Sequence, residues 1–279
     1  MLKQRIITGL ILAPIAIGGI FFLEPLAFSW FIGFVIAVGA WEWANLAGFS
    51  KQMERFGFSA CLVALLYASS FIDVKYVLGA SVLGWFFAFY LITQYPNKTQ
   101  VWSSRFKRLL IGVFVLIPAW NGLVYIRGAE LTGFQYQGQS VSSLWLILYI
   151  MFIVWGADVG AYFAGRTWGN KKLAPSVSPG KSWAGVYGGL ATIAFFALVA
   201  SSLLEMSLSN TLILVSFTLI TGAISVAGDL FESMLKRHRG IKDSSQLLPG
   251  HGGILDRVDS LTAAAPVFTF LLIIAGWLV

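Results

Sequence analysis

Charge, glycine and histidine crowd together in one stretch of an otherwise apolar chain, residues 233–259. The stretch reads SMLKRHRGIKDSSQLLPGHGGILDRVD and contains both histidines of the sequence. Carboxylates hold hard cations such as Mg²⁺, and Lys and Arg side chains hold phosphate oxygens. A segment this polar between two long apolar runs must lie in water or line a wet cavity. The residue types therefore indicate chemistry on a metal-bound polyphosphate at a membrane surface.

Three carboxylates in and just before this stretch, Asp229, Asp256 and Asp259, are the predicted metal ligands. If a helix resumes after the glycine-rich turn, Asp256 and Asp259 fall at i and i+3 on one helix face. With Asp229 opposite, they would bind one or two Mg²⁺ ions that bridge a triphosphate. The alternative is that Lys236 and Arg257 only neutralise these acids. A double-glycine turn next to acids at a helix start favours the functional interpretation.

The basic side chains of the stretch would clamp phosphate oxygens. The candidate catalytic residues are Asp229, Lys236, Arg237, Lys242, Asp243, His251, Asp256, Arg257 and Asp259. Ser233 is a candidate substrate contact, as are Gly252 and Gly253, because backbone at a glycine turn can approach a ligand closely.

A second polar region, residues 158–185, reads DVGAYFAGRTWGNKKLAPSVSPGKSWAG. Pro175 and Pro179 fix a non-helical path, and such a loop could cradle phosphates. Its candidate substrate contacts are Arg166, Lys171, Lys172, Ser178, Lys181 and Ser182. The tripeptide GKS at 180–182 is not a Walker A loop, because that motif needs a glycine where Pro175 stands.

Two acids lie inside apolar runs, where an ionised carboxylate is costly. Asp158 is either functional or a structural partner of Arg166, and the residue types leave both open. Glu42, within the sequence WEW, is expected to pack or pair near the cytoplasmic end of its helix rather than to do chemistry.

The composition predicts where these residues must be held. Of the 279 residues, 58% are hydrophobic and 11% are charged, whereas soluble domains carry about 25% charged residues. The apolar runs are continuous rather than alternating, which predicts an all-α, polytopic integral membrane helical bundle of about nine transmembrane helices. The predicted spans are approximately residues 6–23, 27–47, 57–72, 76–94, 109–126, 142–165, 183–204, 210–229 and 261–279.

The basic residues predict the orientation of the bundle. With nine spans, all of them except Lys75 and Arg127 fall on the side of the N-terminus. The positive-inside rule then places the N-terminus and the polar stretch in the cytoplasm. We expect a single membrane-embedded catalytic unit over residues 1–279. N-terminal helices would occupy about 1–108 and the catalytic portion about 109–279.

Residues 233–259 resemble the signature of phosphatidate cytidylyltransferases, also called CDP-diacylglycerol synthases. The matching elements are Ser233, Lys236-Arg237, Lys242-Asp243, Leu248-Pro249, His251-Gly252-Gly253 and Asp256-Arg257-Val258-Asp259. Residues 158–185 are similar to a second region of that family, with Ala184 at a position where many members carry an acid.

The resemblance implies transfer of CMP from CTP to phosphatidic acid, with release of pyrophosphate, in phospholipid biosynthesis. It implies Mg²⁺ as cofactor, with a second ion such as K⁺ in a paired site as an option. The expected partners are CTP, phosphatidic acid and membrane lipid but no nucleic acid, and a homodimer is an open option. The expected location is the bacterial inner (cytoplasmic) membrane, with the active site facing the cytoplasm.

Acids within apolar helices also occur in two other classes of membrane protein. A CDP-alcohol phosphotransferase also handles cytidine nucleotides at a membrane, but its aspartate signature is absent from the sequence. An ion-coupled transporter would use Asp158, Glu42 and Asp229 as ion sites. Against it stands the concentration of phosphate-handling residues in one polar patch.

Overall fold

The computed structural model describes residues 2–136 and 139–278 and is almost entirely helical. Within these residues the helices are α1 (Leu2–Phe22), α2 (Pro25–Leu46), α3 (Gln52–Ser69), α4 (Val74–Gln94), α5 (Arg105–Gly128), α6 (Ser143–Trp168), α7 (Trp183–Leu203), α8 (Leu208–Arg239) and α9 (Leu255–Ile274). A short 3-10 helix, η1 (Thr99–Val101), precedes α5. Two small hairpins, β1 (Gln135–Tyr136) with β2 (Gln139–Ser140) and β3 (Lys172–Ala174) with β4 (Ser178–Ser182), complete the described structure. The predicted all-α class is confirmed.

Seven of the helices, α2 and α4–α9, are long and apolar enough to cross a membrane. Each of the nine predicted spans coincides with a helix, but α1 and α3 are not among these seven. The apolar part of α1, Ile7–Phe22, is short, and α3 opens on the polar residues Gln52, Glu54 and Arg55. Large apolar side chains such as Phe22 and Leu83 are exposed on the outer surface, as lipid-facing residues are. The protein is therefore an integral membrane protein.

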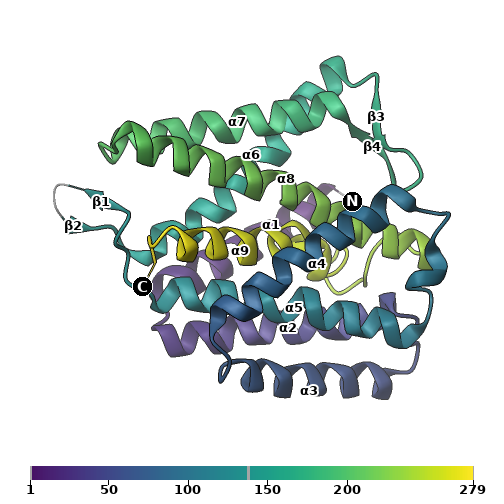
Figure 1. Cartoon of the computed structure of the whole chain (residues 1–279). Coiled ribbons are helices and arrows are strands. Elements are labelled where there is room, and N and C mark those ends of the chain that lie inside the picture. The colour runs from purple at the N-terminus through teal and green to yellow at the C-terminus, as the bar shows by residue number, and fades with distance from the viewer. Residues whose placement is uncertain (1, 137–138, 279) are drawn as a thin grey trace.

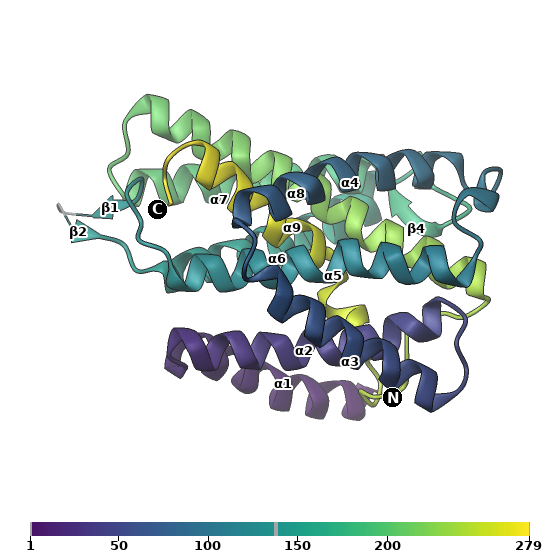
Figure 2. The ribbon, with the colours of Figure 1, turned by 60° about the horizontal axis from the view of Figure 1, so that its bottom comes forward.

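Helix α9 is the central element of the bundle (Figure 1). It packs against α8, α5, α4, α6 and α2. Helices α7 and α8 lie on one side of it, and α2, α3 and α5 lie on the other (Figures 1 and 2). Any side chain at the start of α9 is therefore surrounded by several helices.

Small residues let α6 and α7 touch backbone to backbone. A Cβ on Gly189 would lie 2.6 Å from the carbonyl oxygen of Ala157, and one on Gly160 would lie 2.6 Å from that of Gly188. This contact brings the hairpin that joins α6 to α7 close to the end of α8 (Figure 1). In that hairpin Lys172 pairs with Ser182 and Ala174 with Ser178.

The two ends of the bundle carry different features. At one end, the β3–β4 hairpin lies near the loop between α8 and α9, and the Thr8 hydroxyl of α1 donates to the Pro249 carbonyl of that loop. At the other end, the Thr132 amide donates to the Trp277 carbonyl, beside the β1–β2 hairpin. The chain thus gathers its two polar regions at one end.

The polar stretch is a helix–loop–helix. Helix α8 continues beyond the predicted span end near residue 229 to Arg239, and α9 begins at Leu255, ahead of the predicted span start near residue 261, so a helix does resume after the glycine-rich turn. The extension of α8 is stable because Met234 and Leu235 are buried in the core. Gly240 ends α8 with a φ of 75°, a left-handed conformation that favours glycine.

Candidate active site

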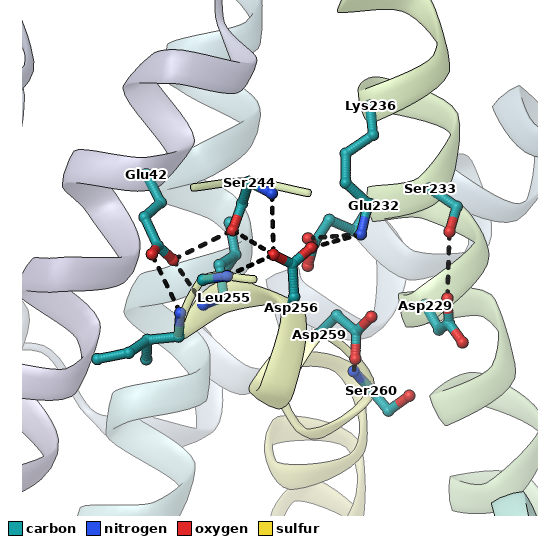
Figure 3. A network of polar contacts seen from close by, with 12 residues as sticks. Glu42, Asp229, Glu232, Ser233, Lys236, Ser244, Leu255, Asp256, Asp259 and Ser260 are labelled. Atoms are coloured by element: carbon teal, nitrogen blue, oxygen red, sulfur yellow. Dashed lines mark hydrogen bonds and ion pairs between the residues drawn. The ribbon is translucent and has the colours of Figure 1, made fainter. Parts of the chain in front are cut away.

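Helices α8 and α9 cross at Gly228. A Cβ there would stand 2.8 Å from the carbonyl oxygen of Asp259 and 3.4 Å from the Cα of Ser260. Only a residue without a side chain allows this approach. The crossing places Asp229, the next residue of α8, beside Asp259 of α9 (Figure 3). The missing side chain of Gly228 therefore explains why Asp259 lies beside Asp229, whereas Asp256 turns to Lys236 and the loop before α9.

Lys236 is the centre of a buried charge network (Figure 3). Its Nζ donates to Oδ1 of Asp256 at 2.7 Å and pairs with Oε1 of Glu232 at 3.1 Å. The side chains of Lys236, Asp256 and Glu232 are 10%, 6% and 3% exposed. Because desolvated charges are costly unless paired, this arrangement fixes the ammonium between the two helices.

The second oxygen of Asp256 binds the loop between the helices. Its Oδ2 accepts from the amide of Ser244 at 2.9 Å, from the Ser244 hydroxyl at 2.8 Å and from the amide of Gly253 at 2.7 Å. A Cβ on Gly252 would lie 2.7 Å from this same oxygen, and its φ of 81° favours glycine. Gly252 and Gly253 thus allow the Asp256 carboxylate to approach the backbone of the turn. Contact of these glycines with substrate remains a prediction.

Glu42 of α2 is fully buried and caps the start of α9. Its Oε2 accepts from the amide of Leu255 at 2.6 Å, and its Oε1 accepts from the amide of Ile254 at 3.0 Å. The hydroxyls of Ser245 and Ser244 donate to it at 2.6 and 3.3 Å. A carboxylate at a helix N-terminus is favoured by the helix dipole and by the unpaired first-turn amides. The expectation that Glu42 pairs rather than reacts agrees with these contacts.

Asp229 faces the β3–β4 hairpin. Its Oδ2 lies 2.6 Å from Nζ of Lys181, and its Oδ1 accepts from the Ser233 hydroxyl at 3.2 Å. Ser182, next in the chain, caps α7 by accepting from the Gly185 amide. Lys181 of β4 thus links the hairpin to α8, and its neighbour Ser182 begins α7.

A cavity of about 390 Å³ opens beside this pair. Its polar lining residues are Asp158, Tyr162, Arg166, Lys181 and Ser182, and its apolar wall includes Val226. Arg166 donates to the hydroxyl of Tyr162, one turn back, and within the described residues it forms no ion pair with Asp158. The structural Asp158–Arg166 pair therefore does not form, and both side chains are available to a ligand in the cavity.

Other predicted site residues lie outside the lining of the cavity. Lys171, Lys172, Lys242, Asp243 and Arg257 are exposed. Arg237 donates to the carbonyl of Val177 at the tip of the hairpin, at 3.3 Å, which links α8 to that loop. Ser178 is partly buried in β4, and Nδ1 of His251 is buried without a partner in the described structure. The two polar regions thus meet through the contacts Lys181–Asp229 and Arg237–Val177, whereas the cavity itself is lined by residues between 157 and 186 and by Val226.

The acids outnumber the bases at the centre of the site. Asp229, Glu232, Asp256 and Asp259 share the two ammonium groups of Lys181 and Lys236. Asp259 accepts from the Ser260 amide at 2.7 Å through Oδ1. No group of three or more Asp, Glu, His or Cys side chains within the described residues is arranged to hold a metal ion. Mg²⁺, however, is commonly held by one or two carboxylates together with substrate phosphates, so the neighbouring Asp229 and Asp259 fit it.

Sequence reasoning assigned no site role to Glu232, Ser244 or Glu42. Glu232 lies four residues before Lys236 on α8, and this i, i+4 spacing is a usable signal. Ser244 and Glu42 carry no comparable signal, because their partners are distant in the chain.

Comparisons with known proteins match nearly the whole chain. A model of the cytidylyltransferase family matches residues 3–275. The phosphatidate cytidylyltransferase of Pseudomonas aeruginosa is 47% identical over 279 residues, covering 99% of both chains. The protein of the same name from Haemophilus influenzae is 39% identical over 291 residues, covering 97% of this chain and 98% of the relative. The similarity therefore extends over the whole bundle, including the helices outside the site.

Proposed function

The chain belongs to the cytidylyltransferase family, and from this premise we propose that it transfers CMP from CTP to phosphatidic acid. The products are CDP-diacylglycerol and pyrophosphate. The observation that carries the proposal is the presence of two Lys–Asp pairs that join separate elements at one end of the bundle. Lys181, paired with Asp229, lines the cavity, and Lys236, paired with Asp256, is buried between α8 and the start of α9. Fixed ammonium groups next to carboxylates suit a reaction between two phosphate compounds.

The reaction brings two anions together. A phosphate oxygen of phosphatidic acid attacks the α-phosphorus of CTP and forms the new P–O bond. The bond from the α-phosphorus to the bridging oxygen of the β-phosphate breaks, and pyrophosphate leaves with that electron pair. The main tasks of the protein are alignment and neutralisation of charge rather than covalent catalysis.

The residues divide these tasks. Lys181, at the cavity wall, binds triphosphate oxygens and is held in place by Asp229. Arg166 and Ser182 line the same cavity and contact the nucleotide or the lipid phosphate. Lys236, fixed by Asp256 and Glu232, stabilises the negative charge of the site from the α8 side.

A divalent cation would supply the positive charge that neutralises the α- and β-phosphates of CTP. Asp229 and Asp259 would be its ligands from this chain, and Asp256 would support them by orienting Lys236 and the loop. An excess of carboxylates over ammonium groups favours this assignment, as does the oxygen of Asp259 that accepts no hydrogen bond in the described structure. A second ion such as K⁺ remains part of the proposal for the same carboxylates.

The site would face the cytoplasm of a bacterial cell, in the inner membrane. The basic residues at this end of the bundle support that orientation through the positive-inside rule. Phosphatidic acid would then enter from the inner leaflet, with its head group at the level of the cavity.

Release of pyrophosphate by the purified protein tests the proposal. We expect pyrophosphate from CTP with phosphatidic acid, and none when diacylglycerol, which lacks the attacking phosphate, replaces it. Asp256→Asn should lose this activity while remaining folded, whereas Asp73→Asn, at the opposite end of the bundle, should keep it. A wild-type rate in Asp256→Asn would contradict the role of the network around Lys236. Equal pyrophosphate release with diacylglycerol would contradict the proposed reaction.

A further inference from the structure

Three arginines converge outside the candidate active site, around the turn that follows α2. A Cβ on Gly48 would lie 3.4 Å from Nη2 of Arg108 and 3.6 Å from Nε of Arg105. Nε of Arg239 donates to the carbonyl of Asn45 at 3.3 Å, and the Gly48 amide donates to the same oxygen. The start of α5, the end of α8 and the turn after α2 thus meet at one point. We name Arg105, Arg108 and Arg239 the arginine cluster.

The cluster has no counter-charge. The ion pairs of the described residues involve Lys75, Lys181 and Lys236, and none involves an arginine. Arg105 and Arg239 both repel the charge of Arg108. Three guanidinium groups without a carboxylate are unfavourable together unless an anion joins them.

Arg108 provides an independent indication of a ligand. Its side chain is 8% exposed, and its buried Nε has no hydrogen-bond partner in the described structure. Its position is fixed, because the Trp43 indole donates to the Arg108 carbonyl at 2.7 Å. Buried donors in folded proteins nearly always have partners, so this guanidinium is prepared for an acceptor that the chain itself does not supply.

The three guanidinium groups of the cluster favour a phosphate group as the ligand. Guanidinium groups bind phosphate through paired, charge-assisted hydrogen bonds. Arg105 and Arg108 also lie in the first turn of α5, where no side chain caps the helix and the helix dipole favours an anion. We propose that the arginine cluster is a phosphate-binding site separate from the active-site cavity.

The cluster lies apart from the cavity, although Arg239 is only three residues beyond Lys236 of the buried charge network. Val226 lines the cavity and Arg239 lies thirteen residues further along α8, which at about 1.5 Å per residue is roughly 20 Å. The cavity lining contains no residue of the arginine cluster.

The source of the phosphate is a phospholipid head group. Phe106 and Leu110 are 65% and 43% exposed on the same stretch of α5 as the cluster. The apolar remainder of α5 is long enough to cross a membrane. A lipid whose chains lie beside this end of α5 would have its phosphate at the level of Arg105, the first residue of the helix and the exposed member of the cluster.

Lipid binding to the full-length protein in detergent micelles tests this site. Native mass spectrometry during titration with phosphatidylglycerol should give an apparent Kd about tenfold weaker for Arg108→Gln and for Arg105→Gln, as expected from the loss of a charge-assisted contact. Arg105 is exposed, so its variant gives an answer even if Arg108→Gln fails to fold. Lys107→Gln is the matched control, because Lys107 is exposed and its replacement removes one charge from the same helical turn while leaving the three arginines in place.

Competition with inorganic phosphate distinguishes a lipid phosphate from free phosphate as the ligand. If it does not displace phosphatidylglycerol, a lipid head group is the ligand. If it displaces the lipid, and only in proteins with an intact cluster, the site takes soluble phosphate as well. Unchanged affinity in Arg105→Gln would overturn the proposal. Equal weakening in Lys107→Gln would also overturn it, because the attraction would then be general surface charge. Neither measurement depends on the transferase activity.

Discussion

The carboxylate of Glu42 accepts a 2.6 Å hydrogen bond from the amide of Leu255, the first residue of α9. The two residues are far apart in the chain and belong to helices on different parts of the bundle. Through this contact α2 fixes the start of the helix that carries Asp256 and Asp259. Glu42 is thus a positioning residue, which acts on the site through α9.

Replacing Glu42 by Gln should therefore destabilise the site. The amide group of Gln would face the Leu255 or Ile254 amide, donor against donor. One buried amide left unpaired costs about 1–3 kcal/mol. We expect a lower melting temperature in detergent and a reduced kcat, measured on the same preparation. Glu24→Gln, an exposed acid with no side-chain cap contact, is the control. A melting temperature equal to that of the control would contradict the role of Glu42.

Gly228→Ala should separate α8 from α9. The added Cβ would meet backbone atoms of Asp259 and Ser260, which cannot rotate away as a side chain can. Overpacking of this kind costs roughly 1–3 kcal/mol. Gly84→Ala provides the comparison, because a Cβ there meets nothing within 4 Å. We expect loss of transfer activity and a lower melting temperature only in Gly228→Ala, and the same behaviour in both variants would show that the crossing is not critical.

Lys181 and Asp229 should behave as one functional unit. Their side chains are 26% and 29% exposed, so the pair adds little to stability, about 0–1 kcal/mol. For activity, Lys181→Met and Asp229→Asn should each lower kcat/KM by about a hundredfold or more, and the double variant should lose little beyond either. Lys98→Met, an exposed lysine bonded to Tyr90, is the control. Fully additive losses would indicate that the two residues act separately.

Metal removal should stop the reaction. Chelation by EDTA is expected to abolish pyrophosphate release, and added Mg²⁺ should restore it. In Asp259→Asn the Mg²⁺ concentration for half-maximal rate should rise about tenfold, because one of two protein ligands is lost. The same titration of Asp73→Asn should match the wild type. Full activity in EDTA would exclude the proposed cation.

Apolar runs were sufficient to predict where the helices lie, because seven of the nine provide enough apolar length to cross a membrane. Helices α8 and α9 extend beyond the apolar runs that predicted their membrane spans, because charged side chains find partners there. The charged residues Glu232 and Lys236 pair inside the bundle, and Met234 and Leu235 bury the same turns.

The polar contacts were harder to predict than the helices. Asp158 and Arg166 are two turns apart in one helix, and Arg166 instead bonds the closer Tyr162. The partners of Glu42 lie about two hundred residues away, so no local spacing indicates them. Lys181 and Asp229 were both predicted as site residues. Their ion pair depends on the contact of α6 with α7, which the spacing of residues in the sequence does not define.

The fate of the CTP phosphates tests the central claim most directly. CTP labelled at the α-phosphate and, separately, at the γ-phosphate is incubated with the purified protein and phosphatidic acid, and the lipid is extracted. We predict that the α-label enters the lipid and that the γ-label appears only in pyrophosphate. Entry of the γ-label into the lipid, or no transfer of either label, would contradict the account.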